Sequence, residues 1–121
     1  MTRNIRILSA LAAAVIATTT VPAISSAFTA GTVTAIAPDD GLNIRKWPGA
    51  NSAIIDVYLL NEPISLTGRC KNIVTNVSFR IDGPGSVEGK YAKMKKANVW
   101  CQVMTDAADR GWARGTYIWP E

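Results

Sequence analysis

The stretch GLNIRKWPG, residues 41–49, decides the fold. Its apolar residues Leu42 and Ile44 alternate with polar neighbours, which is the period of a β-strand with one buried face. The Pro-Gly pair that closes the stretch is a turn signal, so we expect the strand to end before it. Lys46 and Trp47 occupy this turn in place of the small residues that turns favour. The stretch therefore predicts a strand followed by a loop whose tip carries a cation and a large aromatic side chain.

The same alternation returns in two later segments. One face of each predicted strand collects the apolar residues, namely Ile64, Leu66 and Cys70 in the first segment and Val99, Cys101 and Val103 in the second. Turn chemistry rich in Gly, Pro, Asp and Asn separates the segments. Short, closely spaced strands of this kind predict an all-β fold, a small barrel formed by one domain.

The N-terminus has the layout of a secretory signal peptide. Arg3 and Arg6 precede an apolar run over residues 7–17, and small residues lead up to Ala27. The run is shorter than the roughly 20 residues that span a bilayer, which disfavours the alternative of a membrane anchor. We expect cleavage after Ala27 and export of residues 28–121 to the periplasm or the extracellular space, with no stable membrane insertion afterwards.

The charge of the exported part is small. The chain has 13 Lys and Arg against 9 Asp and Glu. Without Arg3 and Arg6, the count is 11 against 9, or a net charge of +2. So small an excess does not predict nucleic-acid binding.

Cys70 and Cys101 are the two cysteines of the chain. In an oxidising compartment, pairing is the default, and strand parity places both residues on buried faces. We therefore predict a disulfide between two neighbouring strands, worth about 3 to 4 kcal/mol on the chain-entropy model. A reactive thiol or a metal site is the alternative, and the absence of His from the chain argues against a metal site.

Residues for catalysis are scarce. Without His, neither a Ser-His-Asp nor a Cys-His arrangement can form. The paired acids Asp39-Asp40 and the residues Asp106 and Asp109 lie in turn-like contexts, where Asp side chains cap the backbone. The sequence therefore predicts a protein that is not an enzyme and that holds no cofactor.

Five motifs taken in order resemble the bacterial SH3-like (SH3b) domain, in particular its exported single-domain form with a Cys pair. They are Gly41 to Arg45 with the Pro-Gly turn, residues 53–58, residues 64–68, Trp100 to Val103, and Gly111 to Ile118. The resemblance covers residues 32–70 and 99–119 and implies a small SH3-like barrel. The chain departs from the family pattern at Lys46-Trp47, where Ser-Gly is usual, and by an insertion over residues 71–98.

The resemblance also implies a ligand site built on loop aromatics. The candidate platform consists of Trp47, Tyr58 and Tyr117, with Arg45 and Lys46 placed to meet carboxylates of the ligand. Trp100 shares strand parity with Gln102, so we expect it on the outer face, as a weaker candidate. The alternative for Trp47 is a packing role, in which its ring folds back over the barrel edge.

The insertion is predicted to form a β-hairpin. Apolar and polar residues alternate from Ile73 to Ile81, a Gly-Pro-Gly turn follows, and residues 86–91 return. A basic arm then follows, with helix formers among its cations Lys90, Lys93, Lys95 and Lys96. This arm is either a solvated face that protects a sheet edge or a docking surface for an acidic partner.

These observations support two classes of function. The first is a non-enzymatic cell-envelope module that binds peptidoglycan, through either its cell-wall peptide or its glycan. The second is a protein-interaction factor, such as a periplasmic inhibitor or immunity protein, or a secreted factor that acts on a host. The fold resemblance favours the first class. The insertion at residues 71–98 favours the second class, because a unique insertion is suited to one dedicated partner, here an envelope protein.

Overall fold

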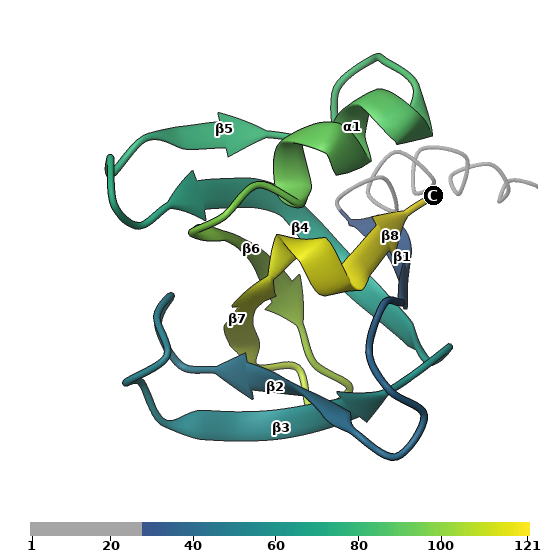
Figure 1. The fold of residues 1–121 in the computed structure, drawn as a ribbon, viewed down its shortest axis with the longest axis vertical. Coiled ribbons are helices and arrows are strands. Elements are labelled where there is room, and N and C mark those ends of the chain that lie inside the picture. The colour runs from purple at the N-terminus through teal and green to yellow at the C-terminus, as the bar shows by residue number, and fades with distance from the viewer. Residues whose placement is uncertain (1–27) are drawn as a thin grey trace, which may run out of the picture.

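The computed structural model describes residues 28–121, so the predicted signal peptide at residues 1–27 lies outside the described part. Eight strands form one antiparallel sheet in this part of the chain (Figure 1). The prediction of an all-β fold is confirmed. No helix within residues 28–121 has the length and apolar character to cross a membrane.

The sheet follows the order β3-β2-β7-β6-β4-β1-β8, with β5 beside β4. The strands are β1 (Thr29–Val33), β2 (Gly41–Arg45), β3 (Ile54–Leu59), β4 (Pro63–Asn72), β5 (Ser78–Arg80), β6 (Val99–Met104), β7 (Arg110–Arg114) and β8 (Ile118–Pro120). Two helical segments complete the domain, the α-helix α1 (Val87–Met94) and the 3₁₀ turn η2 (Gly115–Tyr117).

The sheet curls so that strands far apart in its order share one core. Leu42 of β2 and Tyr58 of β3 belong to the same buried cluster as Val33 of β1 and Ile118 of β8. The alternation of residues is clearest along β4, where apolar inward positions alternate with mostly polar outward ones, and it explains why this strand contributes to the core. Figure 1 shows β2 and β3 running together on one side of the core, with β4 and β6 on another.

The long strand β4 connects the two parts of the sheet. It pairs with β1 near its start and with β5 near its end, while β6 lies along its other edge. The register with β6 shifts between Leu66 and Cys70. Gly68 lies inside this irregularity at a φ of +99°, a conformation that favours glycine. The bend at Gly68 therefore lets one strand serve both parts of the sheet.

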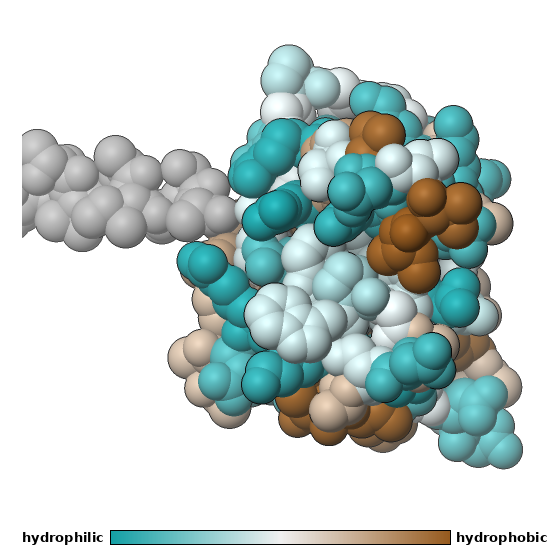
Figure 2. Space-filling view, turned by 90° about the vertical axis from the view of Figure 1, so that its left-hand side faces the viewer, coloured by the Kyte–Doolittle hydropathy of each residue, from teal (hydrophilic) through white to brown (hydrophobic). Residues whose placement is uncertain are grey.

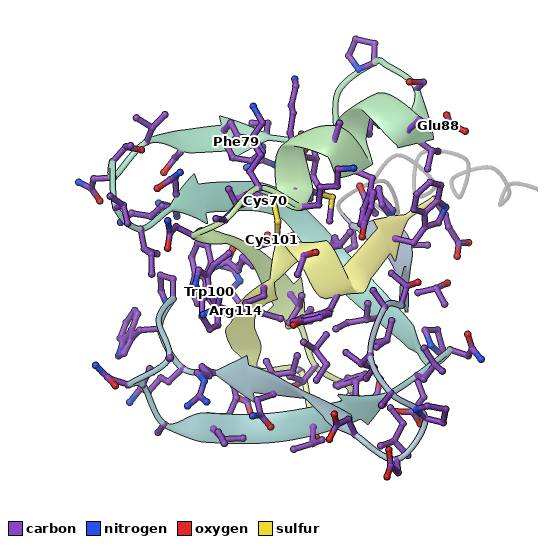
Figure 3. The ribbon with its side chains drawn as sticks, in the orientation of Figure 1. Cys70, Phe79, Glu88, Trp100, Cys101 and Arg114 are labelled. Atoms are coloured by element: carbon purple, nitrogen blue, oxygen red, sulfur yellow. A yellow bond between two sulfur atoms is a disulfide. The ribbon has the colours of Figure 1, made fainter. Side chains whose placement is uncertain are left out.

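The predicted disulfide is confirmed. Cys70 and Cys101 face each other across β4 and β6, with an S–S distance of 2.04 Å (Figure 3). Both residues are fully buried in the core cluster, as the strand parity predicted. The bridge therefore fixes the strand pair at the centre of the sheet.

The prediction of a hairpin from Ile73 to Tyr91 is wrong. The one strand in this segment is β5, and it pairs back onto β4. The Asn72 Oδ1 atom accepts hydrogen bonds from the N–H groups of Val74 and Thr75, which holds a turn where the alternation suggested a strand. The local hydrogen bonds of the Asn side chain override the apolar pattern.

A helix replaces the predicted return strand. Ser86 caps α1, because its Oγ atom accepts a hydrogen bond from the Gly89 N–H at 3.0 Å. Helix formers of the basic arm make up half of α1, namely Lys90, Ala92, Lys93 and Met94. Met94 is the buried residue of α1 and packs against η2, where Gly115 leaves room for it. Figure 1 shows α1 beside β8, covering this end of the core.

Strand β3 forms an end of the sheet order and pairs with β2. Two of its backbone N–H groups are bound by carboxylates of the same chain. Val57 N–H donates to Asp56 Oδ1 and Leu59 N–H donates to Glu62 Oε1, each at 2.8 Å. This edge also exposes apolar side chains, which are those of Ile54, Ile55, Val57 and Leu59. Charged groups on an exposed strand edge oppose pairing with other chains.

Candidate functional site

A cleft of about 210 Å³ lies between β2 with its preceding loop and the neighbouring strands β6 and β7. Its polar and aromatic lining residues are Asp40, Asn43, Arg45, Trp100, Arg114 and Tyr117. Small or aliphatic residues, among them Leu42 and Ala50, complete the walls. The structure thus brings together three of the six residues predicted to bind a ligand, namely Arg45, Trp100 and Tyr117.

Arg45 is positioned by the strand and by the loop that follows it. It ends β2, at a register shift in the pairing with β3. Its Nη1 atom donates a hydrogen bond to the Ser52 carbonyl at 2.7 Å. A guanidinium has five N–H donors, so this bond leaves donors for a ligand. The loop therefore orients a cation at the mouth of the cleft.

Trp100 does not have the exposed position that was predicted. Its strand parity is as expected, because it lies outside the core cluster that contains Cys101 and Val103. Nevertheless its side chain is only 2% exposed. The reason is Arg114, its cross-strand partner on β7, whose guanidinium carbon lies 5.2 Å from the centroid of the indole ring (Figure 3). The prediction omitted the residue that would cover Trp100.

The indole nitrogen of Trp100 is unusual within residues 28–121. It is buried, and it has no hydrogen-bond partner there. An unsatisfied buried donor costs about 1–3 kcal/mol, so native proteins rarely retain one. The side chain of Trp100 therefore carries a buried hydrogen-bond donor that no other group in residues 28–121 satisfies.

Tyr58 does not belong to the ligand platform, and this part of the prediction is wrong. It faces inward from β3 and is a member of the core cluster. Its hydroxyl accepts a hydrogen bond from the Asp106 N–H at 3.0 Å, which ties β3 to the turn before β7. Burial raises the pKa of the Tyr58 hydroxyl above its usual value. Tyr58 is therefore a structural residue.

Trp47 is exposed as expected, with 63% of its surface accessible. The alternative, that its ring folds over the barrel edge, is therefore wrong. The loop around it is ordered by hydrogen bonds, since Lys46 N–H donates to the Ala53 carbonyl and Trp47 N–H donates to Ser52 Oγ. Trp47 and the exposed Lys46 lie outside the lining of the cleft, while Ala50 of the same loop lines it. They are placed to extend a binding surface beyond the cleft.

Tyr117 lines the cleft from η2 and is half-buried. It also packs against the core cluster, so its ring joins the cleft wall to the interior. The basic arm lies elsewhere. Lys90 and Lys93 are on α1, and Lys95 and Lys96 follow directly after it. The structure therefore separates the basic arm from the cleft, and the two share no lining residue.

Arg114 and Asn43 are cleft residues that the sequence interpretation missed. The signal for Arg114 was present, because a tight connection between two predicted strands fixes which residues face each other across them. Pairing β6 with β7 around the turn at Asp106 places Arg114 opposite Trp100. Asn43 alternates with Leu42 and Ile44 on β2, so its outward position was also implied.

Acidic residues in the described part do not cluster into a metal centre. Residues 28–121 contain no group of three or more His, Cys, Asp or Glu side chains that would hold a metal ion. Asp39 and Asp106 lie in turns, in agreement with their interpretation as turn residues. The cleft combines the cations of Arg45 and Arg114 with aromatic rings and the carboxylate of Asp40.

Comparison of the chain with protein-family models, with curated proteins and with solved structures finds no match.

Proposed function

We propose that the protein is a non-enzymatic binding module of the cell envelope, and that its cleft binds a carboxylate-bearing cell-wall peptide. The observation that carries this proposal is the convergence of Arg45 and Arg114 on a cleft walled by Trp100 and Tyr117. Guanidinium groups form short, charge-assisted and often bidentate hydrogen bonds with carboxylates. The resemblance to SH3b domains supports the same function.

The other polar groups of the cleft fit such a ligand. Asp40 supplies a carboxylate that would accept a hydrogen bond from an amino group, and Asn43 supplies both a donor and an acceptor. A wall peptide that carries a free amine as well as carboxylates would meet complementary charges in one place.

The size of the cleft limits the ligand. A volume of about 210 Å³ is below the roughly 300–1,000 Å³ of pockets that enclose drug-sized molecules. We therefore propose that the cleft holds one or two residues of the peptide, including its charged end. The exposed ring of Trp47 would contact the rest of the ligand outside the cleft.

The disulfide is compatible with export, because such bonds persist in oxidising compartments. An exported protein meets the cell wall directly, in the periplasm or outside the cell. The alternative is a protein-interaction factor whose partner is an envelope protein. In that case the same cleft would bind a carboxylate of the partner protein. The two functions are distinguished by the ligand and not by the site.

The test is co-sedimentation with purified, insoluble peptidoglycan. It uses residues 28–121, which contain every described strand, α1 and the disulfide. We expect the wild type to sediment and Arg45→Gln and Arg114→Gln to lose about tenfold or more in affinity, since hydrogen bonds to charged groups are worth roughly 1.5–3 kcal/mol. Arg110→Gln is the matched control, because Arg110 lies at the opposite end of β7 from Arg114.

Each result has a defined meaning. Sedimentation of the wild type and of both cleft variants to the same extent would remove the cleft from the proposal. Loss of binding in Trp47→Ala alone would make the exposed loop the anchor. If the wild type stays in solution, the wall is not the ligand, and the same variants serve in a search for an envelope-protein partner.

A further inference from the structure

A second groove, of about 470 Å³, lies between the β4–β5 turn and the end of α1. Its floor is apolar and includes Val77, Phe79 and Val99. Lys93 and Lys96 line the same groove. Apolar and cationic groups thus lie within reach of one ligand, on a part of the molecule that the cleft does not use.

The β4–β5 turn beside this groove exposes aliphatic side chains. Val74 is 71% exposed, Val77 is 58% exposed and Ile73 is 37% exposed. Figure 1 shows the turn projecting from the edge of the molecule, and Figure 2 shows hydrophobic patches on this side with hydrophilic residues around them. We call Ile73, Val74 and Val77 the aliphatic tip.

The aliphatic tip is held in its exposed position by hydrogen bonds. Asn72 Oδ1 binds the N–H groups of Val74 and Thr75 at 2.9 and 3.1 Å, and the Asn76 N–H donates to the Asn72 carbonyl. The Ile73 N–H donates to the Asn98 carbonyl, which connects the tip to the segment after α1. The exposed apolar surface is therefore a fixed feature of the fold.

Cations outnumber acids in the part of the sequence that contains the tip. Residues 63–105 hold two acids, Asp82 and Glu88, and seven cations, which are Arg69, Lys71, Arg80, Lys90, Lys93, Lys95 and Lys96. The rest of residues 28–121 holds the other four cations and the other seven acids. Arg80 forms an ion pair with Asp82. The positive charge of the exported part is therefore concentrated in the segment that forms the groove, where Lys93 and Lys96 line it.

We propose that this region docks on the surface of an anionic lipid bilayer, with the aliphatic tip among the acyl chains and Lys93 and Lys96 against the headgroup phosphates. Apolar side chains bordered by Lys are the combination that binds membrane interfaces, because burial and charge attraction act together. A projecting tip beside Lys93 and Lys96 is complementary to a broad anionic surface. This activity is independent of the proposed peptide binding at the cleft.

Sedimentation with lipid vesicles tests the proposal on residues 28–121, which exclude the apolar N-terminal run. Vesicles of phosphatidylglycerol mixed with phosphatidylcholine are compared with vesicles of phosphatidylcholine alone. We expect binding to the mixed vesicles that weakens with added salt. Replacing Lys93 and Lys96 together by Gln lowers the partition coefficient roughly 30-fold, since each Lys near an anionic surface contributes about 1 kcal/mol.

Val74→Ser tests the tip itself and is expected to lower the partition coefficient about tenfold, because less apolar surface enters the bilayer. The matched controls are Val57→Ser and Arg110→Gln, which change an exposed apolar residue and a cation away from the groove. Both controls should bind as the wild type does. Circular dichroism confirms that each variant is folded.

Three outcomes would overturn the proposal. The first is no binding to the mixed vesicles at low salt, which would leave the groove to an acidic protein. The second is equal binding to both kinds of vesicle. The third is unchanged binding by the Val74→Ser variant, which would show plain charge adhesion without insertion of the tip.

Discussion

Arg114 covers the indole ring of Trp100 across strands β6 and β7, at 5.2 Å from the guanidinium carbon to the ring centroid. The pair explains how a tryptophan on the outer face of a small sheet becomes buried. Both residues also line the cleft. The packing of this face and the lining of the cleft therefore depend on the same two side chains.

Replacement of Arg114 by Gln should lower the free energy of unfolding by about 0.5–1 kcal/mol, the usual contribution of a cation–π contact at the surface. Urea unfolding measures this change. Arg110→Gln, on the same strand, should change the free energy by less than about 0.5 kcal/mol. Equal effects of the two substitutions would show that Arg114 contributes no more than an ordinary surface cation.

Replacement of both Cys70 and Cys101 by Ala should cost about 3 to 4 kcal/mol of stability, because the bridge closes a loop with a sequence separation of 31 residues. The urea midpoint of the oxidised wild type and that of the double variant give the difference. Addition of a reductant should lower the midpoint of the wild type and leave that of the variant unchanged. A reductant-insensitive wild type would contradict the prediction.

Gly115→Ala should destabilise the domain by about 1–3 kcal/mol, since an added methyl group has no space between η2 and α1. A Cβ atom at Gly115 would lie 2.4 Å from the Met94 carbonyl oxygen, which is backbone and cannot move aside. Gly83→Ala is the matched control, because a Cβ atom there meets nothing within 4 Å. Thermal unfolding should show a lower Tm for the first variant, and equal Tm values would refute this packing.

Stability should fall at alkaline pH because of Tyr58. Its pKa is raised in the folded protein by burial, so the folded state keeps a proton that the unfolded state loses above about pH 10. The contribution of Tyr58 to the free energy of unfolding is fully present below about pH 10 and is lost as the pH rises through the pKa of the folded state. Urea midpoints measured from about pH 8 to 11 should decline less steeply in Tyr58→Phe than in the wild type.

The Tyr58→Phe variant should also be less stable at neutral pH, by roughly 0.5–1.5 kcal/mol, because it lacks the hydrogen bond to the Asp106 N–H. This loss is separate from the pH dependence. Parallel declines of the two proteins with pH would show that Tyr58 is not the group responsible.

Strand parity was sufficient to predict the central features of the fold. The alternation around Leu42, Leu66 and Val103 placed these residues in the core, and the same argument placed both cysteines there. It failed at residues 73–77, where the side chain of Asn72 binds the backbone and forms a turn. The alternation of apolar residues is the same whether or not the Asn72 side chain binds the backbone, so it could not predict this turn.

The candidate site was harder to predict, because exposure depends on neighbours across the sheet. Parity correctly directed Trp100 away from the core, but the covering by Arg114 depends on register. Tyr58 was assigned by resemblance to a loop platform, whereas its position on β3 directs it inward. Trp47 has no strand partner, so the sequence left both exposure and packing over the barrel edge open, and the structure shows it exposed.

The carboxylates of Asp56 and Glu62 oppose association of the protein through the edge of β3 at high concentration. They occupy the N–H groups of Val57 and Leu59 that a strand from another molecule would otherwise use. A second copy would have to displace both carboxylates before it extended the sheet, in spite of the apolar side chains exposed there. The edge of β3 therefore acts as a barrier to fibril growth.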